Sequence, residues 1–193
     1  ADFVANVRTQ ASQKGYKVSV ALAPKTSANQ KGLLYEGKDY KLLGAAADSV
    51  LLMTYEWGYT YGPPMAVAPI NKVREVVEYA ITEIPTEKID LGIPNYGYDW
   101  TLPFVQGSSK AQTIGNVEAV QIAIENNAVI QFDETAMSPF FHYEKDGLQH
   151  EVWFEDVRSM REKFHLITEY GLRGMGYWQI MKLFRVNWLL LAD

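Results

Sequence analysis

Apolar positions along the chain follow two patterns, short continuous runs and longer stretches with helical spacing. Short runs bounded by Pro, Gly or polar residues are typical of buried parallel strands, and they cover residues 17–23, 49–55, 89–94 and 174–179. Apolar residues spaced three and four positions apart predict helices at residues 2–14, 39–47, 69–84 and 156–170. Strands and helices therefore alternate, which predicts a parallel α/β sheet with right-handed crossovers.

The stretch between the third and fourth of these strands has a different pattern. Residues 116–126 predict a helix, residues 129–132 a strand, and residues 140–154 a β-hairpin. The hairpin is expected to turn at Asp146-Gly147, because this dipeptide favours the tight turn between antiparallel strands. We interpret the stretch as a small α+β insertion. The predicted divisions are barrel βα units over 1–100, the insertion over 101–155, and the last barrel helix, strand and tail over 156–193.

Two architectures with a parallel sheet compete. A doubly wound sheet with a nucleotide site carries glycines directly after its first strand, but residues 23–27 (APKTS) contain none. A barrel is favoured, because aromatic and acidic residues gather where the predicted strands end, and barrel enzymes build their sites there. A complete (β/α)8 TIM barrel needs about 250 residues. Four strands therefore predict half of such a barrel.

Composition narrows the classes of function. The 193 residues are 48% hydrophobic and 21% charged, so the chain can bury a core. The net charge is −5, from 18 basic and 23 acidic residues. The chain therefore lacks the basic stripe with which proteins bind nucleic acids. The absence of cysteine excludes disulfides and thiolate metal sites. No apolar run is long enough for a membrane span, and the three histidines lack metal-ligand spacing, so we expect no membrane span, no metal and no cofactor.

Aromatic residues make up 13% of the sequence, with 12 Tyr and 5 Trp. In strands such residues usually fill the core, although they also form surfaces that stack on sugar rings. Glu56 stands out among them, because it follows a largely apolar run and precedes Trp57. A buried carboxylate costs free energy unless it is paired or used in chemistry. The structural alternative is that Glu56 pairs with a neighbouring Arg or Lys.

Several motifs in sequence order resemble glycoside hydrolase family 18, the chitinase-like (β/α)8 barrels. They are residues 53–56 (MTYE), 92–100 (GIPNYGYDW) and 176–178 (GYW), followed by Asn187 and Trp188. Residues 18–24, 54–58 and 133–143 are most similar to the spore-germination branch, whose members cleave N-acetylglucosaminyl bonds in spore cortex peptidoglycan. The resemblance implies the C-terminal half of the barrel and an N-acetylated glycan partner, either cortex peptidoglycan or a chitin oligosaccharide. It also implies a location in the spore or cell envelope.

The family's substrate-assisted mechanism assigns roles to individual residues. The acetamido oxygen of the sugar attacks the anomeric carbon while a glutamic acid protonates the leaving oxygen. The resemblance implies that Tyr55 donates its hydroxyl to the acetamido oxygen, that Glu56 orients this group, and that Trp178 is the floor under the sugar. The remaining predicted substrate-binding residues line or rim the same pocket: Met53, Trp57, Tyr96, Tyr98, Asp99 and Trp100.

The sequence departs from the family pattern in two places and lacks one motif. Chitinases commonly have Asp where Glu56 stands, and acidic residues where residues 179–182 (QIMK) follow Trp178. The Asp-x-x-Asp-x-Glu motif that supplies the catalytic acid occurs nowhere. The acidic pairs Asp133-Glu134 and Glu155-Asp156 fall in the insertion and at a predicted helix start, where acids stabilise a helix. We therefore expect the proton donor upstream, outside these residues, and this chain alone to be inactive.

Three alternatives remain open from the sequence. Glu56 and Asp99 could act as the acid and nucleophile of a conventional glycosidase. The same aromatic groove without an acid would make a lectin-like carbohydrate-binding module. A half-barrel would also leave open strand edges near Val18 and Tyr177, which favour a homodimer or a strand swap.

Overall fold

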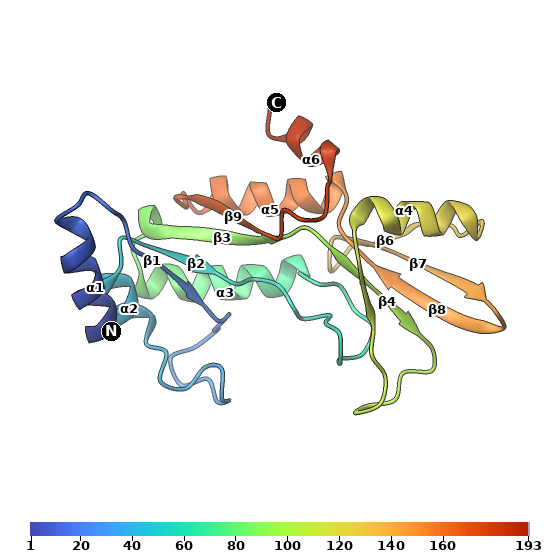
Figure 1. The fold of residues 1–193 in the computed structure, drawn as a ribbon, viewed down its shortest axis with the longest axis horizontal. Helices are drawn as coiled ribbons and strands as arrows, with labels where there is room; N and C mark the ends of the chain where they lie inside the picture. The colour runs from blue at the N-terminus through green and yellow to red at the C-terminus, as the bar shows by residue number, and fades with distance from the viewer. Residues whose placement is uncertain (193) are drawn as a thin grey trace. The chain divides into compact units, whose positions relative to one another are not determined.

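The computed structural model describes residues 1–192, which contain two sheets. The first sheet has four strands in the order β1-β2-β3-β9, with β1 and β9 at its two ends (Figure 1). Strands β1, β2 and β3 pair in parallel, with Val20 opposite Val50 and Val50 opposite Ile89. Their bounds are β1 (Ser19–Leu22), β2 (Ser49–Leu52), β3 (Ile89–Pro94) and β9 (Gly174–Trp178). These are the four strands that the apolar runs predict, which confirms an α/β fold.

Helices alternate with these strands in the chain, and α1 precedes the first strand, as the helical spacing predicts. They are α1 (Asp2–Ser12), α2 (Tyr40–Ala46), α3 (Ile70–Glu83) and α5 (Val157–Glu169), with a 3-10 turn at η1 (Thr86–Lys88). The apolar stripe of α3 explains why this segment is a helix, because Val73, Val76, Val77 and Ala80 are all fully buried. Within residues 1–192, no helix is long and apolar enough to cross a membrane.

The second sheet has five antiparallel strands in the order β5-β4-β8-β7-β6. Its strands are β4 (Gly97–Thr101), β5 (Gln112–Ile114), β6 (Gln131–Asp133), β7 (Ser138–Lys145) and β8 (Leu148–Trp153). The β7–β8 hairpin turns at Asp146 and Gly147, with φ of 54° and 76°. Both values are left-handed, as the predicted tight turn requires.

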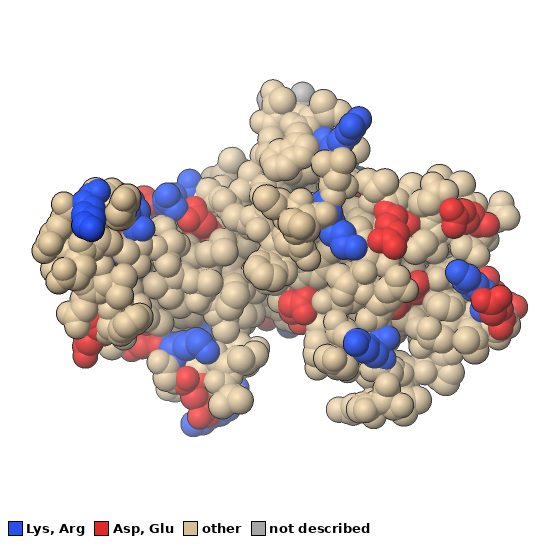
Figure 2. Space-filling model, in the orientation of Figure 1, with Lys and Arg blue, Asp and Glu red and all other residues tan. Residues whose placement is uncertain are grey.

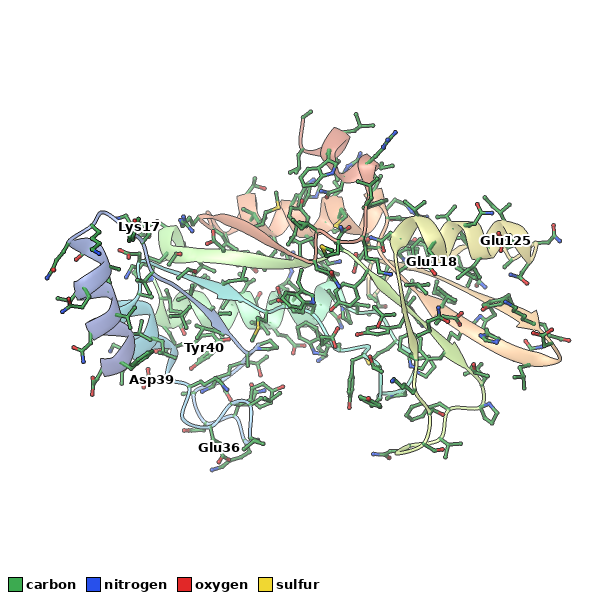
Figure 3. The ribbon with its side chains drawn as sticks, in the orientation of Figure 1. Lys17, Glu36, Asp39, Tyr40, Glu118 and Glu125 are labelled. Carbon is green, nitrogen blue, oxygen red and sulfur yellow. The ribbon has the colours of Figure 1, made fainter. Side chains whose placement is uncertain are left out.

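Two elements of this region were not predicted. Strands β4 and β5 fall in residues 97–114, where no strand was predicted, although Tyr98, Trp100 and Leu102 alternate with polar residues. The helix α4 (Asn116–Glu125) matches its prediction, and Figure 3 shows Glu118 and Glu125 along it. A short helix, α6 (Arg185–Leu190), follows β9 and was also not predicted.

The chain divides into two compact units. The first contains Ala1–Thr54, Val73–Gly92 and His165–Gly176; the second contains Tyr55–Lys72, Ile93–Phe164 and the chain from Tyr177 onward. Each is described by itself below. The three-part division into βα units, insertion and last unit stays a prediction.

The antiparallel sheet of the second unit has a different cluster on each face, because neighbouring strand residues point to opposite sides. One face packs on α4, through Ala119, Ala123, Phe141 and Val152. The other carries an aromatic cluster with Tyr96, Tyr98 and Trp100 at its centre. On the face of the molecule drawn in Figure 2, basic side chains are scattered among acidic ones rather than gathered in a stripe.

The acidic pair at the start of α5 has two separate roles. Asp156 accepts hydrogen bonds from the backbone N–H groups of Arg158 and Ser159, at 2.9 and 3.1 Å, and so stabilises the helix start as predicted. Glu155 does not share this role. It is fully buried and bonds the ammonium group of Lys163, itself 1% exposed, at 2.8 Å. The sequence did not reveal this buried ion pair.

Candidate active site

The turn after β2 positions Tyr55 and Glu56. The N–H groups of Trp57 and Gly58 donate to the carbonyl groups of Val67 and Ala66, at 3.1 and 2.9 Å. A Cβ atom on Gly58 would lie 2.0 Å from the Met65 carbonyl oxygen, so only glycine fits this close approach. Glu56 has a φ of +69°, a strained backbone conformation for a residue other than glycine. The tertiary contacts therefore hold Glu56 in one conformation.

Two tyrosine hydroxyls hold the Glu56 carboxylate. The Tyr96 hydroxyl donates a short hydrogen bond to Oε1, and the Tyr98 hydroxyl lies 2.9 Å from Oε1 and 3.2 Å from Oε2. Among the residues described, Glu56 forms no ion pair with Arg or Lys, so the structural alternative for this residue is wrong. Glu56 is also exposed rather than buried. Burial, together with the Glu56 carboxylate, raises the pKa of Tyr96.

Tyr55 directly precedes Glu56 in the chain. It is half-buried and packs against the cluster that contains Tyr96, Tyr98 and Trp100. Burial, and then the negative charge of Glu56, raise the pKa of the Tyr55 hydroxyl. Both effects favour the neutral phenol, because ionisation would bury a charge beside another negative charge. Tyr55 is therefore a hydrogen-bond donor at neutral pH.

The aromatic cluster behind Glu56 is largely inside the protein. The Tyr96 and Tyr98 rings meet edge to face at 5.7 Å, and the Tyr98 and Trp100 rings lie 5.6 Å apart. Trp100 is 1% exposed, and its indole Nε1 donates to the Gly62 carbonyl at 2.8 Å. Trp100 therefore supports the cluster from the core instead of forming an exposed rim, whereas Trp57 is half-buried.

Asp99 is placed on the opposite face of β4 from Tyr98. Its carboxylate accepts from the Tyr143 hydroxyl at 2.6 Å and lies 2.9 Å from His150 Nδ1. The side chain is nearly fully buried, with both oxygens occupied. Since Tyr98 bonds Glu56 from the other face, the structure does not bring Asp99 and Glu56 together as a catalytic carboxylate pair.

Trp178 ends β9 and exposes 57% of its surface. Its carbonyl accepts from the backbone N–H of Asn95 at 2.8 Å. The Asn95 side chain donates to the carbonyls of Gln179 and Lys182, at 3.2 and 2.7 Å. Asn95 therefore fixes the turn after Trp178, and it directly precedes Tyr96.

Asn116, at the start of α4, extends this polar network. Its amide lies 3.4 Å from the Asn95 side-chain oxygen, and its own oxygen accepts from the Glu155 N–H at 3.0 Å. Asn95 and Asn116 are 6% and 1% exposed. Sequence analysis missed both, although two asparagines in apolar surroundings are a signal for buried hydrogen bonding.

The remaining candidate, Met53, belongs to the first unit, where its N–H donates to the Leu22 carbonyl at 2.9 Å. No group of three or more His, Cys, Asp or Glu residues in the described part of the chain could hold a metal ion. The second unit thus brings Tyr55, Glu56, Tyr96 and Tyr98 together, a set suited to hydrogen bonding with an uncharged polar group.

Comparison with known proteins shows to which family the chain belongs. The model of the glycosyl hydrolases family 18 matches residues 1–182. The chain belongs to glycosyl hydrolase family 18. This confirms the resemblance carried by the MTYE, GIPNYGYDW and GYW motifs.

Relatives of this family 18 chain include spore enzymes. It is 52% identical to the cortical fragment-lytic enzyme of Bacillus subtilis over 192 residues, which are 99% of this chain and 44% of that protein. The crystal structure of the Bacillus cereus spore cortex-lytic enzyme SleL matches with a TM-score of 0.95 and 47% identity, over 99% of this chain and 44% of that one. The chain thus spans less than half the length of these relatives.

A chitinase matches the same fold at lower identity. The structure from Chromobacterium violaceum has a TM-score of 0.91 and 27% identity, and the match covers 99% of this chain and 59% of that one. The α/β fold of family 18 is therefore shared well beyond the spore enzymes.

Proposed function

We propose that this chain supplies the acetamido-binding part of a glycosidase that cleaves N-acetylglucosaminyl bonds in spore cortex peptidoglycan. One observation carries the proposal: the Tyr96 and Tyr98 hydroxyls hold the Glu56 carboxylate at the aromatic cluster against which Tyr55 packs. Burial and the charge of Glu56 keep the Tyr55 hydroxyl protonated. A phenol donor and a fixed carboxylate acceptor at one cluster suit an amide, which offers one C=O and one N–H. The names of the spore relatives support cortex as the substrate.

The proposed chemistry is substrate-assisted. Tyr55 donates to the acetamido oxygen and Glu56 accepts from the acetamido N–H, so that this oxygen points at the anomeric carbon. The oxygen bonds to that carbon as the glycosidic bond breaks, and the leaving oxygen takes a proton from a general acid. Water then opens the oxazolinium ring, and the original anomeric configuration is retained. The negative charge of Glu56 stabilises the positive charge that develops on the ring.

The general acid is proposed to come from outside these residues. The Asp-x-x-Asp-x-Glu motif does not occur in the 193 residues, and both oxygens of Asp99 are occupied by Tyr143 and His150. The four parallel strands are correspondingly proposed to form the C-terminal half of the family's (β/α)8 barrel. Association of two copies through the edges at β1 and β9 stays a prediction.

The proposal is tested by Tyr55→Phe in the intact natural protein, with cortex fragments as substrate. Loss of one such donor removes about 2–4 kcal/mol of transition-state stabilisation, or roughly 30- to 1,000-fold in kcat/KM. Tyr59→Phe is the matched control, because Tyr59 is 41% exposed and lies on the following loop. Equal turnover in the two variants would remove Tyr55 from the mechanism.

The second candidate is a carbohydrate-binding module without catalysis. The exposed Trp178 favours it, because an indole open to solvent can stack on a sugar ring. Binding of cortex fragments by the intact protein without any release of reducing ends would support the module and contradict the glycosidase.

A further inference from the structure

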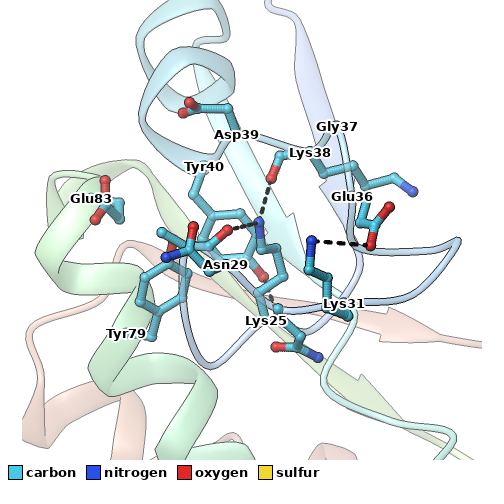
Figure 4. A pocket seen from close by; sticks show the side chains of 12 residues that line it. Lys25, Asn29, Lys31, Glu36, Gly37, Lys38, Asp39, Tyr40, Tyr79 and Glu83 are labelled. Atoms are coloured by element: carbon cyan, nitrogen blue, oxygen red, sulfur yellow. Dashed lines mark hydrogen bonds and ion pairs between the residues drawn. The ribbon is translucent and has the colours of Figure 1, made fainter.

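Two loops of this chain are each held by a buried polar side chain that donates to two of their backbone carbonyls. In the loop after β1, the Lys25 ammonium group bonds the carbonyls of Ala28 and Lys38, at 3.2 and 2.9 Å, and the same loop lines the cavity around it (Figure 4). In the loop after β9, the Asn95 amide bonds two carbonyls within residues 179–182. The second loop differs from the first, because it directly follows the tryptophan on which the sugar is expected to stack.

Asn95 holds this tryptophan, Trp178, as well as the loop behind it. The backbone N–H of Asn95 donates to the Trp178 carbonyl at 2.8 Å. Its side-chain Nδ2 donates to the carbonyls of Gln179 and Lys182, at 3.2 and 2.7 Å. An amide nitrogen has two N–H donors, so both are used here. Three hydrogen bonds from one residue, itself 6% exposed, therefore fix the backbone from Trp178 to Lys182.

Asn116 fixes the orientation of the Asn95 amide from behind. The Asn116 amide nitrogen lies 3.4 Å from the Asn95 side-chain oxygen, and its own oxygen accepts from the Glu155 N–H at 3.0 Å. Because the Asn95 oxygen faces a donor, its nitrogen faces the two loop carbonyls. Asn116 is 1% exposed. The Asn95 side chain is thus set by the protein interior before any ligand arrives.

The next residue in the chain, Tyr96, reaches the other part of the candidate site. Its hydroxyl donates to the Glu56 carboxylate, and its ring, 2% exposed, packs edge to face on Tyr98. The backbone at residues 95–96 therefore has two connections. Asn95 binds the end of β9, and Tyr96 binds Glu56 in the turn after β2.

We propose that Asn95 is a positioning residue that holds the sugar-stacking Trp178 and the acetamido-binding Glu56 in one geometry. The inference rests on the proposed function. An indole under the sugar ring and a carboxylate at its acetamido group act together only when their separation is fixed. A misplacement of about 1 Å can cost about 100-fold in rate, even when it originates away from the reacting atoms.

Positioning of this kind acts on kcat more than on KM. The acetamido oxygen must point at the anomeric carbon as the glycosidic bond breaks, so the fixed geometry stabilises the transition state more than the bound substrate. A residue that only supported sugar binding would change KM instead. A residue with a purely structural role would lower the free energy of unfolding and leave the kinetics of the folded enzyme unchanged.

The test is Asn95→Asp in the intact natural protein, with cortex fragments as substrate. The carboxylate has the shape of the amide but no N–H for the carbonyls within residues 179–182. We expect kcat to fall about tenfold or more, with a smaller change in KM. Asn126→Asp is the matched control, because Asn126 is also half-buried or deeper and donates to one carbonyl, that of Ile122 at 2.8 Å, at the end of α4. It should keep kcat and KM. Unchanged kcat in Asn95→Asp, or a loss confined to KM, would overturn the proposal.

Double variants show through which residues Asn95 acts. In a Trp178→Ala background the floor is already lost, so Asn95→Asp should reduce kcat/KM less than it does in the unaltered protein. The same is expected in a Tyr96→Phe background, where the connection to Glu56 is already broken. Losses of kcat/KM that multiply independently in both backgrounds would show that Asn95 does not act through these residues, and would overturn the proposal.

A measurement on the unaltered protein decides the case if Asn95→Asp does not fold. A thiazoline analogue of the oxazolinium ion derived from N-acetylglucosamine is the probe. We expect its binding to slow hydrogen exchange in residues 95–96 and in residues 179–182 together. Slower exchange near Glu56 without any change in residues 179–182 would overturn the proposal.

Failure of this inference and failure of the proposed function give different results. Unchanged turnover in Tyr55→Phe, with turnover lost in Asn95→Asp, would overturn the proposed acetamido chemistry and leave Asn95 as a positioning residue. Turnover lost in Tyr55→Phe and kept in Asn95→Asp would do the reverse.

Discussion

The two units differ in where their ion pairs lie. In the first unit, strand residues such as Val50, Leu52 and Leu91 are fully buried, and ion pairs such as Arg74–Glu169 lie at the surface. In the second unit, the Glu155–Lys163 pair is fully buried, and Asp99 bonds Tyr143 and His150 in the interior. The first unit also buries the Lys25 ammonium group, but this group bonds backbone carbonyls and not a carboxylate. A strand core of apolar residues needs only the right pattern, whereas an interior with ion pairs needs each group matched to a partner.

This difference bears on the candidate site. Tyr96 and Tyr98 are buried, yet their hydroxyls must reach the exposed Glu56. The rings are fixed by the aromatic cluster and the strand register, so the hydroxyls are held before any ligand arrives. Such preorganisation is what electrostatic catalysis requires. The polar interior of the second unit therefore positions the side chains of the candidate site, while the apolar strands of the first unit form a scaffold.

The largest expected effect comes from breaking the buried ion pair. Lys163→Met leaves the Glu155 carboxylate without its cation, and Oε1 of Glu155 already has no hydrogen-bond partner among the described residues. We expect the free energy of unfolding to fall by about 3–5 kcal/mol, measured by urea denaturation. Arg74→Met breaks an exposed pair in the first unit and should change stability little. A similar loss of unfolding free energy in both variants would show that the buried and the exposed ion pair contribute equally to stability.

A double variant sharpens the same point. Glu155→Leu combined with Lys163→Met replaces both charges by apolar groups, and it should recover most of the lost stability, because no uncompensated charge remains. If the double variant is less stable than Lys163→Met alone, the ion pair itself, and not the unpaired charge, is the main contribution.

An intermediate effect is expected at the amide network. Asn116→Ala leaves the Glu155 N–H and the Asn95 oxygen without this partner, which costs about 1–3 kcal/mol of unfolding free energy. It should also speed hydrogen exchange in residues 179–182, where Asn95 holds the turn. Gln121→Ala, an exposed position on the same helix, is the control. Unchanged hydrogen exchange in Asn116→Ala would show that Asn116 does not stabilise the turn at residues 179–182.

The smallest effect is expected in the first unit, at Asp48. Its carboxylate accepts from the Val18 N–H at 2.8 Å and from Arg8 Nε at 3.0 Å, and these contacts hold its pKa below the ordinary value of 3.8. The stabilisation is therefore present above pH 3.8 and is lost as the pH falls through the lowered pKa. At pH 7 we expect Asp48→Asn to have a slightly lower melting temperature than the unaltered protein. In stronger acid the two melting temperatures should be equal. A difference that grows in acid would contradict this assignment.

Much of the first unit was predictable, because its signals are local. The apolar stripe of α3 and the apolar runs of β2 and β3 can each be recognised from a short segment of sequence. The Asp146-Gly147 turn in the second unit is an equally local signal. The candidate site was predictable only in part. Its motifs led to Tyr55 and Glu56, and through them to the family. They did not reveal that Glu56 is exposed and held by two tyrosines rather than by a cation.

By itself, the sequence determined the alternation of strands and helices, the hairpin turn and the family, since each depends on spacing within short segments. Only the tertiary structure decided which side chains meet. Glu56 and Tyr96 are 40 residues apart, and Asp99 and His150 are 51 apart. Contacts of this kind depend on strand register, and a shift of one residue would turn every side chain of β4 to the other face. The register of β4 therefore places Tyr98 at the candidate site and Asp99 in the opposite core.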